Sequence, residues 1–189
     1  MPRTVDVDAR RDRLVAAVCE VAVRDGLDAV TARSVAAAAG LSLGAVTRTF
    51  ASQEQLHAAA MRAVAERVAA RSAAVPRIGD PVRCALALLD QVMPFAEETR
   101  AEAQVYYAYV ARARAVPALA AIADEVDAAL LASCAEVVAL VAPGARPAAV
   151  VELHALTEGI AFGLVTWPHR RDAAEQRQVL ADWLVRACG

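Results

Sequence analysis

The sequence predicts an all-α fold of about nine helices, with a small N-terminal head and a larger helical body. Alanine accounts for 49 of the 189 residues, and alanine has the highest intrinsic helix propensity of all amino acids. Strand-forming residues other than valine are sparse, and aromatic residues make up only 4% of the chain. The eight glycines and eight prolines fall where helices are expected to break.

The first helix is expected to begin at Asp8, as its N-cap, and to run to about Asp25, where Gly26 suits the end of a helix. One face of this helix is apolar, because its apolar residues follow the spacing of a single helical face: Leu14, Ala17, Val18, Val21 and Ala22. The pattern predicts a helix that packs this face against the rest of the head.

Two short helices separated by a tight turn are predicted between residues 31 and 50. Thr31 is expected to cap a helix over 32–39, and Gly40 suits a left-handed corner, where a Cβ atom costs energy. Ser42 is expected to cap the next helix, with Val46 and Phe50 facing inward. This is a helix-turn-helix layout, so DNA is the first partner to consider.

The body is predicted to be entirely helical. A long helix is expected over 53–74 with Ser52 as its N-cap, followed by a short internal loop around Pro76, Gly79 and Pro81. Pro94 is expected to kink or end the helix that contains it. The remaining helices are predicted near 81–97, 99–114, 117–141, 147–167 and 172–187.

Composition argues against several classes of protein. The formal net charge is −2 and seven arginines balance seven acids in the first 56 residues, whereas a small constitutive DNA coat protein would be basic. The sequence contains three histidines and no H-E-x-x-H, G-x-S-x-G or Walker motif, so no enzyme is expected.

Cysteine spacing and hydropathy point to a cytoplasmic protein without cofactor, metal or membrane partner. The four cysteines have no C-x-x-C spacing and are expected as small apolar filler: Cys19, Cys84, Cys134 and Cys188. The N-terminus has no signal peptide, and Glu136 interrupts the best candidate for a membrane span.

The order and spacing of residues over about 50 N-terminal positions resemble the TetR family of transcriptional regulators. The matching segments are Ala22, Gly26-Leu27, Thr31-Ala32-Arg33, Val35-Ala36, Ala39-Gly40-Leu41-Ser42, Gly44-Ala45-Val46, Phe50 and Ser52-Gln53-Glu54-Gln55-Leu56. The resemblance implies a DNA-binding domain over 1–52 and a ligand-binding and dimerisation domain over 53–189. It also implies a homodimer formed through the last two long helices, without cofactor.

The chain departs from the family pattern in two places. The segment Val46-Thr47-Arg48-Thr49-Phe50 lacks the usual aromatic residues of the recognition helix, so Thr47 stands where a tyrosine often contacts phosphate. Gln53 replaces the usual lysine at the start of the fourth helix. We therefore expect DNA affinity to depend more on Arg48, Arg33 and helix N-termini.

Residues of the two short helices that are not needed for the internal face are the candidates for contacts with double-stranded DNA. Arg48 suits guanine, because its planar fork matches O6 and N7, although a phosphate contact or a solvated position is equally compatible. Leu43 or Ala45 suits a thymine methyl, and Thr31 and Ser42 have a plain capping role as well as proximity to phosphate. The full set is Thr31, Arg33, Ser42, Leu43, Gly44, Ala45, Thr47, Arg48 and Thr49.

The last two helices are predicted to form the dimer interface. Gly159 and Gly163 lie four residues apart, which allows close helix approach, and the last helix carries an apolar stripe. The resemblance implies that these helices pair with their twins through Gly159, Gly163, Val179, Leu180, Trp183 and Leu184; packing within one chain is the alternative.

The effector pocket is expected within the body, and the small number of charges there favours a small, mainly apolar ligand. Its candidate residues are Met61, Gln91, Met93, Phe95, Tyr106, Tyr107, Tyr109, Cys134, His154, Phe162 and Trp167. At most two of the three tyrosines can face one cavity, and His154 fits a core or interface position better than a ligand contact. Glu97, Glu98 and Glu102 leave room for a cationic ligand but are expected to form a solvated face.

Together these features predict a homodimeric repressor that an effector releases from a pseudo-palindromic operator. A TetR-type activator and a helical protein-interaction adaptor without inducer binding are the alternatives. Sequence-specific binding to a DNA palindrome distinguishes the regulators from the adaptor.

Overall fold

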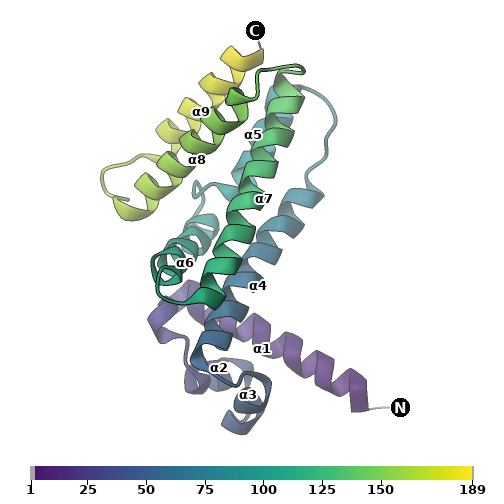
Figure 1. Ribbon diagram of the computed structural model, residues 1–189, viewed down its shortest axis with the longest axis vertical. Helices are drawn as coiled ribbons and strands as arrows, with labels where there is room; N and C mark the ends of the chain where they lie inside the picture. Colours follow the sequence, from purple (N-terminus) through teal and green to yellow (C-terminus); the bar gives the residue numbers. More distant parts are fainter. Residues whose placement is uncertain (1–2, 189) are drawn as a thin grey trace. The chain divides into compact units, whose positions relative to one another are not determined.

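The computed structural model describes the backbone of residues 3–188 and the side chains of residues 9–117 and 119–187. The all-α prediction is confirmed: this part of the chain contains nine α-helices, one short 3-10 helix and no strand (Figure 1). The elements are α1 (Arg3–Asp25), η1 (Leu27–Ala29), α2 (Ala32–Ala39), α3 (Leu43–Thr49), α4 (Gln53–Ala74), α5 (Pro81–Val92), α6 (Glu97–Ala113), α7 (Pro117–Val141), α8 (Ala148–Thr166) and α9 (Ala173–Cys188).

The helices are assigned to two compact units. Unit 1 comprises Met1–Arg67 and Gln104–Ala123, and unit 2 comprises Val68–Ala103 and Asp124–Gly189. The division after residue 52 stays a prediction; by packing, unit 1 extends into α4 and includes the second half of α6 and the start of α7.

Two predicted helix ends needed correction. The prediction that Asp8 caps the first helix is wrong, because α1 already begins at Arg3 and Asp8 lies inside it. The helix that starts at Pro81 ends at Val92, five residues earlier than expected, because Pro94 forces the residue before it out of the helical region. Met93 is indeed extended, with φ −84° and ψ 142°.

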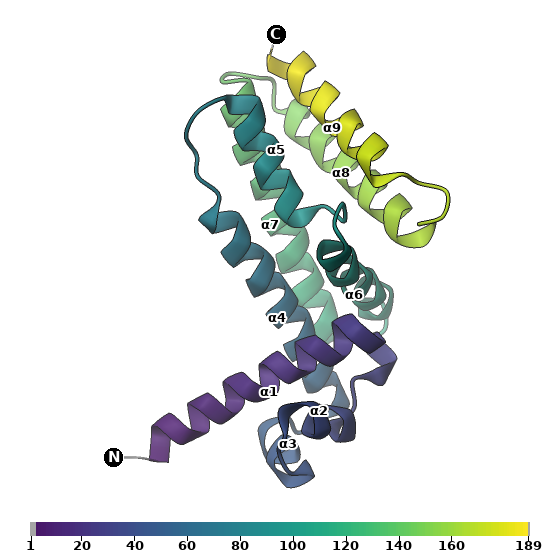
Figure 2. The same cartoon turned by 180° about the vertical axis from the view of Figure 1, so that it is seen from behind.

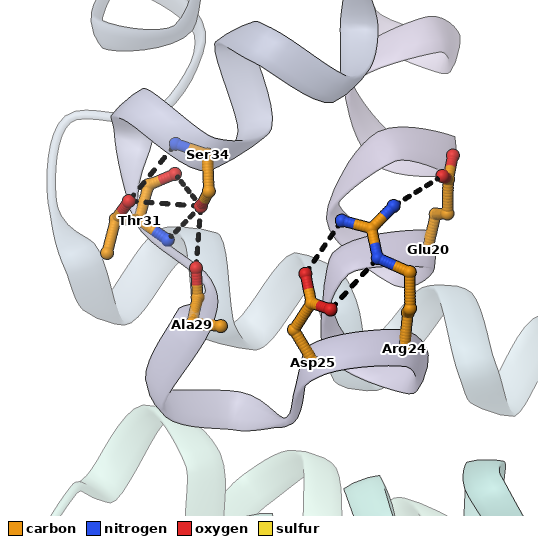
Figure 3. Close-up of polar contacts among 6 residues, drawn as sticks. All are labelled: Glu20, Arg24, Asp25, Ala29, Thr31 and Ser34. Carbon is orange, nitrogen blue, oxygen red and sulfur yellow. Dashed lines mark hydrogen bonds and ion pairs between the residues drawn. The ribbon is translucent and has the colours of Figure 1, made fainter.

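The core of unit 1 forms where α1 packs against α2 and η1, and α2 against α3. Val18 of α1, Val35 of α2 and Val46 of α3 are completely buried, as the apolar spacing predicts. Burying each such side chain contributes about 1.5–3 kcal/mol. At the end of α1, Arg24 pairs with Glu20 and Asp25 on the surface (Figure 3).

The core of unit 2 forms where α9 packs against α5 and α8. The helices α8 and α9 lie side by side in both views (Figures 1 and 2). Leu180 and Leu184 of α9 are completely buried beside Leu164 of α8. The guanidinium of Arg177 donates two hydrogen bonds of 2.7 Å to the carboxylate of Asp90, which fixes α9 on α5.

The helix α8 is the segment of the described chain that is long and apolar enough to cross a membrane. Its mean hydropathy reaches 1.5 over 18 residues, and 39% of that window is buried. The sequence-based choice of the segment around Glu136 as the best candidate was therefore wrong. The apolar length of α8 serves in part to pack against α9.

Cys19, Cys84 and Cys134 are buried free thiols, and the side chain of Cys188 lies outside the described residues. Within the described residues, no group of three or more His, Cys, Asp or Glu side chains is placed to hold a metal ion.

Candidate functional site

The start of α2 is fixed by a reciprocal cap (Figure 3). The hydroxyl of Thr31 accepts a hydrogen bond from the Ser34 N–H at 3.1 Å, and the Ser34 hydroxyl accepts one from the Thr31 N–H at 2.9 Å. The Ser34 hydroxyl also donates to the Ala29 carbonyl at 2.6 Å. These bonds satisfy backbone donors that the first turn of a helix leaves free. The predicted capping role of Thr31 is confirmed.

The turn between α2 and α3 has the left-handed geometry that glycine favours. Gly40 has φ 61° and ψ 35°, as expected. The guanidinium of Arg13, on α1, donates to the Ala39 carbonyl at 2.9 Å. This bond satisfies a carbonyl at the C-terminal end of α2 and ties it to α1.

The helix α3 begins at the predicted cap and divides into an inner and an outer face. The Ser42 hydroxyl accepts from the Ala45 N–H at 3.2 Å, and Val46 and Phe50 point inward. Leu43 is 48% exposed on the other face. The assignment of Ala45 to the outer face was wrong, because Ala45 is only 6% exposed. Leu43 is thus the better placed of the two for a thymine methyl.

The threonines of α3 direct their hydroxyls at the helix backbone. The Thr47 hydroxyl lies 3.3 Å from the Leu43 carbonyl, and the Thr49 hydroxyl donates to the Ala45 carbonyl at 3.0 Å. Donors used in this way compete poorly for phosphate oxygens, although the hydroxyl oxygens can still accept. Thr47 therefore compensates little for the missing tyrosine.

Two arginines of the helix pair are available for an external partner. Arg33 on α2 and Arg48 on α3 are exposed, and neither guanidinium is paired with another described residue. A Cβ atom added to Gly44 would lie 3.3 Å from Nη1 of Arg48. The arginine thus folds back along the helix over a position that has no side chain.

Gln53, an exposed residue at the start of α4, bonds to groups of its own chain. Its amide nitrogen donates to the Val30 carbonyl and lies 2.9 Å from Nε2 of His57. An amide nitrogen only donates, so Nε2 of His57 accepts this bond and the imidazole is neutral. Burial, reinforced by the nearby charge of Arg112, lowers the pKa of His57. The residue that replaces the usual lysine therefore has a structural role.

The predicted pocket residues are divided between the two units. Within unit 1, Tyr109 is completely buried, and its ring packs edge-on against His57 with centroids 6.1 Å apart. Its hydroxyl has no hydrogen-bond partner among the described residues, and burial raises its pKa. Tyr106 and Tyr107 are half-buried and pack against each other at 5.1 Å. Met61, the fourth candidate of this unit, is buried.

Within unit 2, the predicted pocket residues have different environments. Met93 and Cys134 are buried, and Gln91 and Phe95 are half-buried. Burial raises the pKa of Cys134 to about 11. His154 lies 3.2 Å from a carboxylate oxygen of Asp127, but its buried Nε2 has no hydrogen-bond partner among the described residues.

Glu102 is not part of a solvated face, contrary to expectation. It is 2% exposed and accepts two hydrogen bonds from Arg71, at 3.0 and 2.5 Å. Arg71 also donates to the Gln91 carbonyl at 3.2 Å, so one guanidinium joins α4, α5 and α6 within unit 2. A buried carboxylate needs such a partner, because an isolated buried charge is strongly destabilising.

Two further pocket candidates lie at the surface of unit 2. Phe162 and Trp167 are 46% and 41% exposed, so their assignment to an interior pocket was wrong for an isolated chain. Their rings pack edge-on, with centroids 5.7 Å apart. Trp167 lines an open cavity of about 380 Å³ together with Arg170 and Arg171, two residues that sequence reasoning did not single out.

The predicted dimer residues fall into a buried and an exposed group. Leu180 and Leu184 are completely buried within the chain, so packing inside one chain, the alternative considered for this stripe, is correct for these two. Trp183 is half-buried, and Gly163 is covered by Arg171. Gly159 and Val179 are exposed.

An exposed apolar stripe runs along α8, and the sequence did not single it out as a whole. It consists of Val151, Ala155, Gly159 and Phe162, whose spacing places them on one face of the helix. Val151 is 63% exposed. Leu153 is buried and Val151 is exposed because of how α8 packs, and the hydrophobicity of the two residues does not distinguish them.

A capped pair of short helices joined at a left-handed glycine, with free arginines on its outer face, is the framework of a helix-turn-helix regulator. The family model described as "Bacterial regulatory proteins, tetR family" matches residues 14–60. The model described as "BetI-type transcriptional repressor, C-terminal" matches residues 81–189, more than half of the chain. The chain therefore belongs to the TetR family of transcriptional regulators.

Similar proteins agree with this assignment. The HTH-type transcriptional regulator PksA of Bacillus subtilis (strain 168) is 36% identical over 116 residues, or 60% of this chain and 56% of PksA. The chain thus spans little more than half of that relative. The crystal structure of a transcriptional regulator from Rhodococcus sp. Rha1 matches with a TM-score of 0.79 and 29% identity, covering 94% of this chain and 95% of that one. The multidrug binding protein EbrR, complexed with proflavin, matches with a TM-score of 0.66 and 27% identity, covering 92% and 99%.

Proposed function

We propose that this protein is a homodimeric, sequence-specific DNA-binding repressor that a small, mainly apolar molecule releases from a pseudo-palindromic operator. The observation that carries the proposal is the outer face of the helix pair. Arg33 and Arg48 are exposed on it without partners among the described residues, and Leu43 is exposed on the same face. Unpaired guanidiniums on a recognition helix suit the acceptors of guanine and of phosphate.

Dimerisation follows from both DNA geometry and surface chemistry. Two heads that read half-sites about 34–36 Å apart require a two-fold assembly. The apolar stripe of Val151, Ala155, Gly159 and Phe162 on α8 offers a surface for it, together with Val179 on α9. A second copy covers this stripe better than a membrane does, because Arg146 and Glu152 form an ion pair of 2.5 Å beside Val151.

An effector is proposed to bind in the helical body and to favour a dimer whose head spacing does not fit the operator. A ligand shifts such an equilibrium only by its difference in affinity for the two states. Proflavin, the flat aromatic dye in the complex with EbrR, is a first compound to test. The proposed site of action is the cytoplasm, where a bacterial operator is located.

The test begins with selection of bound fragments from a random DNA library. We expect enrichment of a two-fold symmetric sequence, and binding of the full palindrome well above that of a single half-site. Proflavin and related compounds are then titrated into the protein–operator complex. Failure to enrich any sequence would exclude a regulator and favour the protein-interaction adaptor. Activation rather than repression of a reporter gene would favour the TetR-type activator.

A further inference from the structure

The loop between α8 and α9 carries an open cavity whose lining is aromatic and cationic. The cavity measures about 380 Å³ and is lined by Trp167, Arg170 and Arg171. The cavity is open to solvent, so it suits a small compound that stays partly exposed. DNA reading and dimerisation through the α8 stripe do not use these side chains.

The end of α8 places the indole of Trp167. The backbone N–H of Trp167 donates to the Gly163 carbonyl at 3.0 Å, and the backbone carbonyl of Trp167 accepts from the backbone N–H of Arg170 at 2.9 Å. The ring of Phe162 supports the indole edge-on, at an interplanar angle of 86°. Backbone bonds on both sides and an aromatic neighbour thus fix a ring that is still 41% exposed.

The side chain of Arg171 packs against α8 at Gly163. Atoms Nε and Cγ of Arg171 lie 3.7 and 4.0 Å from the position that a Cβ atom of Gly163 would occupy. The arginine therefore lies across the backbone of α8, with its guanidinium beside the cavity.

The two guanidiniums of this loop have no anionic partner in their own chain. No hydrogen bond or ion pair joins the side chain of Arg170 or Arg171 to another described residue. The nearest carboxylate in the sequence, that of Asp172, accepts a hydrogen bond from the Glu175 N–H at 2.9 Å and caps α9. Two positive charges beside an exposed indole thus stay uncompensated.

We propose that this cavity binds a small organic anion, a carboxylate or phosphate group attached to a flat apolar ring. The guanidiniums of Arg170 and Arg171 would hold the anionic group through paired N–H donors, and the indole of Trp167 would pack against the ring. The positive charge disfavours cationic compounds, and the volume disfavours large ones. This inference does not depend on the proposed DNA-binding function.

The test uses the fact that the chain contains only two tryptophans. In a Trp183→Phe variant, fluorescence reports on Trp167 alone, and calorimetry on the unaltered protein provides an independent measurement. The probes are benzoate, phenyl phosphate, inorganic phosphate, benzyl alcohol and benzylamine. We expect saturable binding of one or both aromatic anions, weaker binding of inorganic phosphate, and none of benzylamine or benzyl alcohol.

Variants then assign the anion to the two arginines. Arg170→Gln combined with Arg171→Gln should weaken binding of the aromatic anion about tenfold or more, as for other charge-assisted contacts. Arg186→Gln, which removes an exposed arginine of α9, should leave it unchanged. Preference for benzoate or for phenyl phosphate identifies the anionic group, and either preference supports the proposal.

Two results would overturn the proposal. One is equal binding of benzyl alcohol, or binding that persists in the double arginine variant. The other is a combined result: the variant with Arg170→Gln and Arg171→Gln no longer forms a dimer, and the unaltered protein binds no anion. This result would assign the loop to contacts with acidic residues of a second copy. Operator binding, measured in parallel, tests the proposed function separately.

Discussion

At the scale of single residues, the outer face of α3 reduces to one strong hydrogen-bonding side chain. Arg48 is exposed and unpaired within the described chain, whereas the hydroxyls of Thr47 and Thr49 are bonded to the helix backbone. If α3 reads bases as proposed, we expect specificity to rest on Arg48 more than it would in a helix with several polar readers.

Arg48→Ala is expected to weaken operator binding by about 1–3 kcal/mol and to relax the preference at one base pair. The reason is the loss of a paired guanidinium contact with guanine. Titrations against the operator and its single-base variants measure both effects, with Arg186→Ala as the matched control. An unchanged base preference would show that Arg48 contacts phosphate or solvent.

Gly44→Ala is expected to stabilise the protein and to weaken operator binding at the same time. Alanine replaces glycine within a helix with a gain of roughly 0.5–1 kcal/mol. The new Cβ atom would lie 3.3 Å from Nη1 of Arg48, so the guanidinium would have to shift by a few tenths of an ångström on the outer face. Thermal unfolding and operator titration measure the two effects. Operator affinity that rises with stability would contradict this role of Gly44.

At the scale of elements, the predictions from sequence are correct where a single residue type determines the backbone geometry. Thr31 and Ser42 as caps, Gly40 in the left-handed turn and the break at Pro94 depend on local chemistry, and the structure confirms them. Ala45 was misassigned because alanine suits either face of a helix, and only packing decides. The burial of Glu102 depends on Arg71, 31 residues away in sequence, which no local pattern reveals.

The burial of His57 makes the stability of unit 1 depend on pH. Because the folded state lowers the pKa of His57, the unfolded chain takes up a proton more readily. The stabilisation is complete above the ordinary histidine pKa of about 6.5 and declines as the pH falls below it. A protonated Nε2 would also face the amide donor of Gln53 in place of accepting from it.

Urea unfolding from about pH 7.5 down to about pH 5.5, across the ordinary histidine range, is expected to show a falling midpoint. His57→Asn should flatten this dependence, and His169→Asn, at an exposed loop position, should not. Equal slopes in all three proteins would assign the pH dependence to carboxylates.

At the scale of the whole molecule, the exposed apolar stripe on α8 is expected to be covered by a second copy in a dimer. Phe162→Glu is expected to dissociate the dimer, because it places a charge in the centre of an apolar interface. Ile78→Glu, which alters a residue that is 84% exposed in the loop before α5, is the control. Sedimentation velocity measures the oligomeric state, and operator titration should show that the dissociated variant binds only half-sites. A monomeric unaltered protein would refute the proposed dimer.

The hydrogen bonds of Gln53 to its own chain have a consequence for the ionic atmosphere of DNA. Each phosphate that a protein cation neutralises releases counterions from the DNA. Each such contact makes the slope of log affinity against log salt concentration steeper by about 0.9. A head without net charge, in which an amide replaces the usual lysine, releases few of them. Operator affinity is therefore expected to decline only gently between low and physiological salt. Gln53→Lys should steepen that decline by about one phosphate contact if the new side chain turns outward. Such a protein would stay bound to its operator, through shape and base contacts, at salt concentrations that release more highly charged regulators.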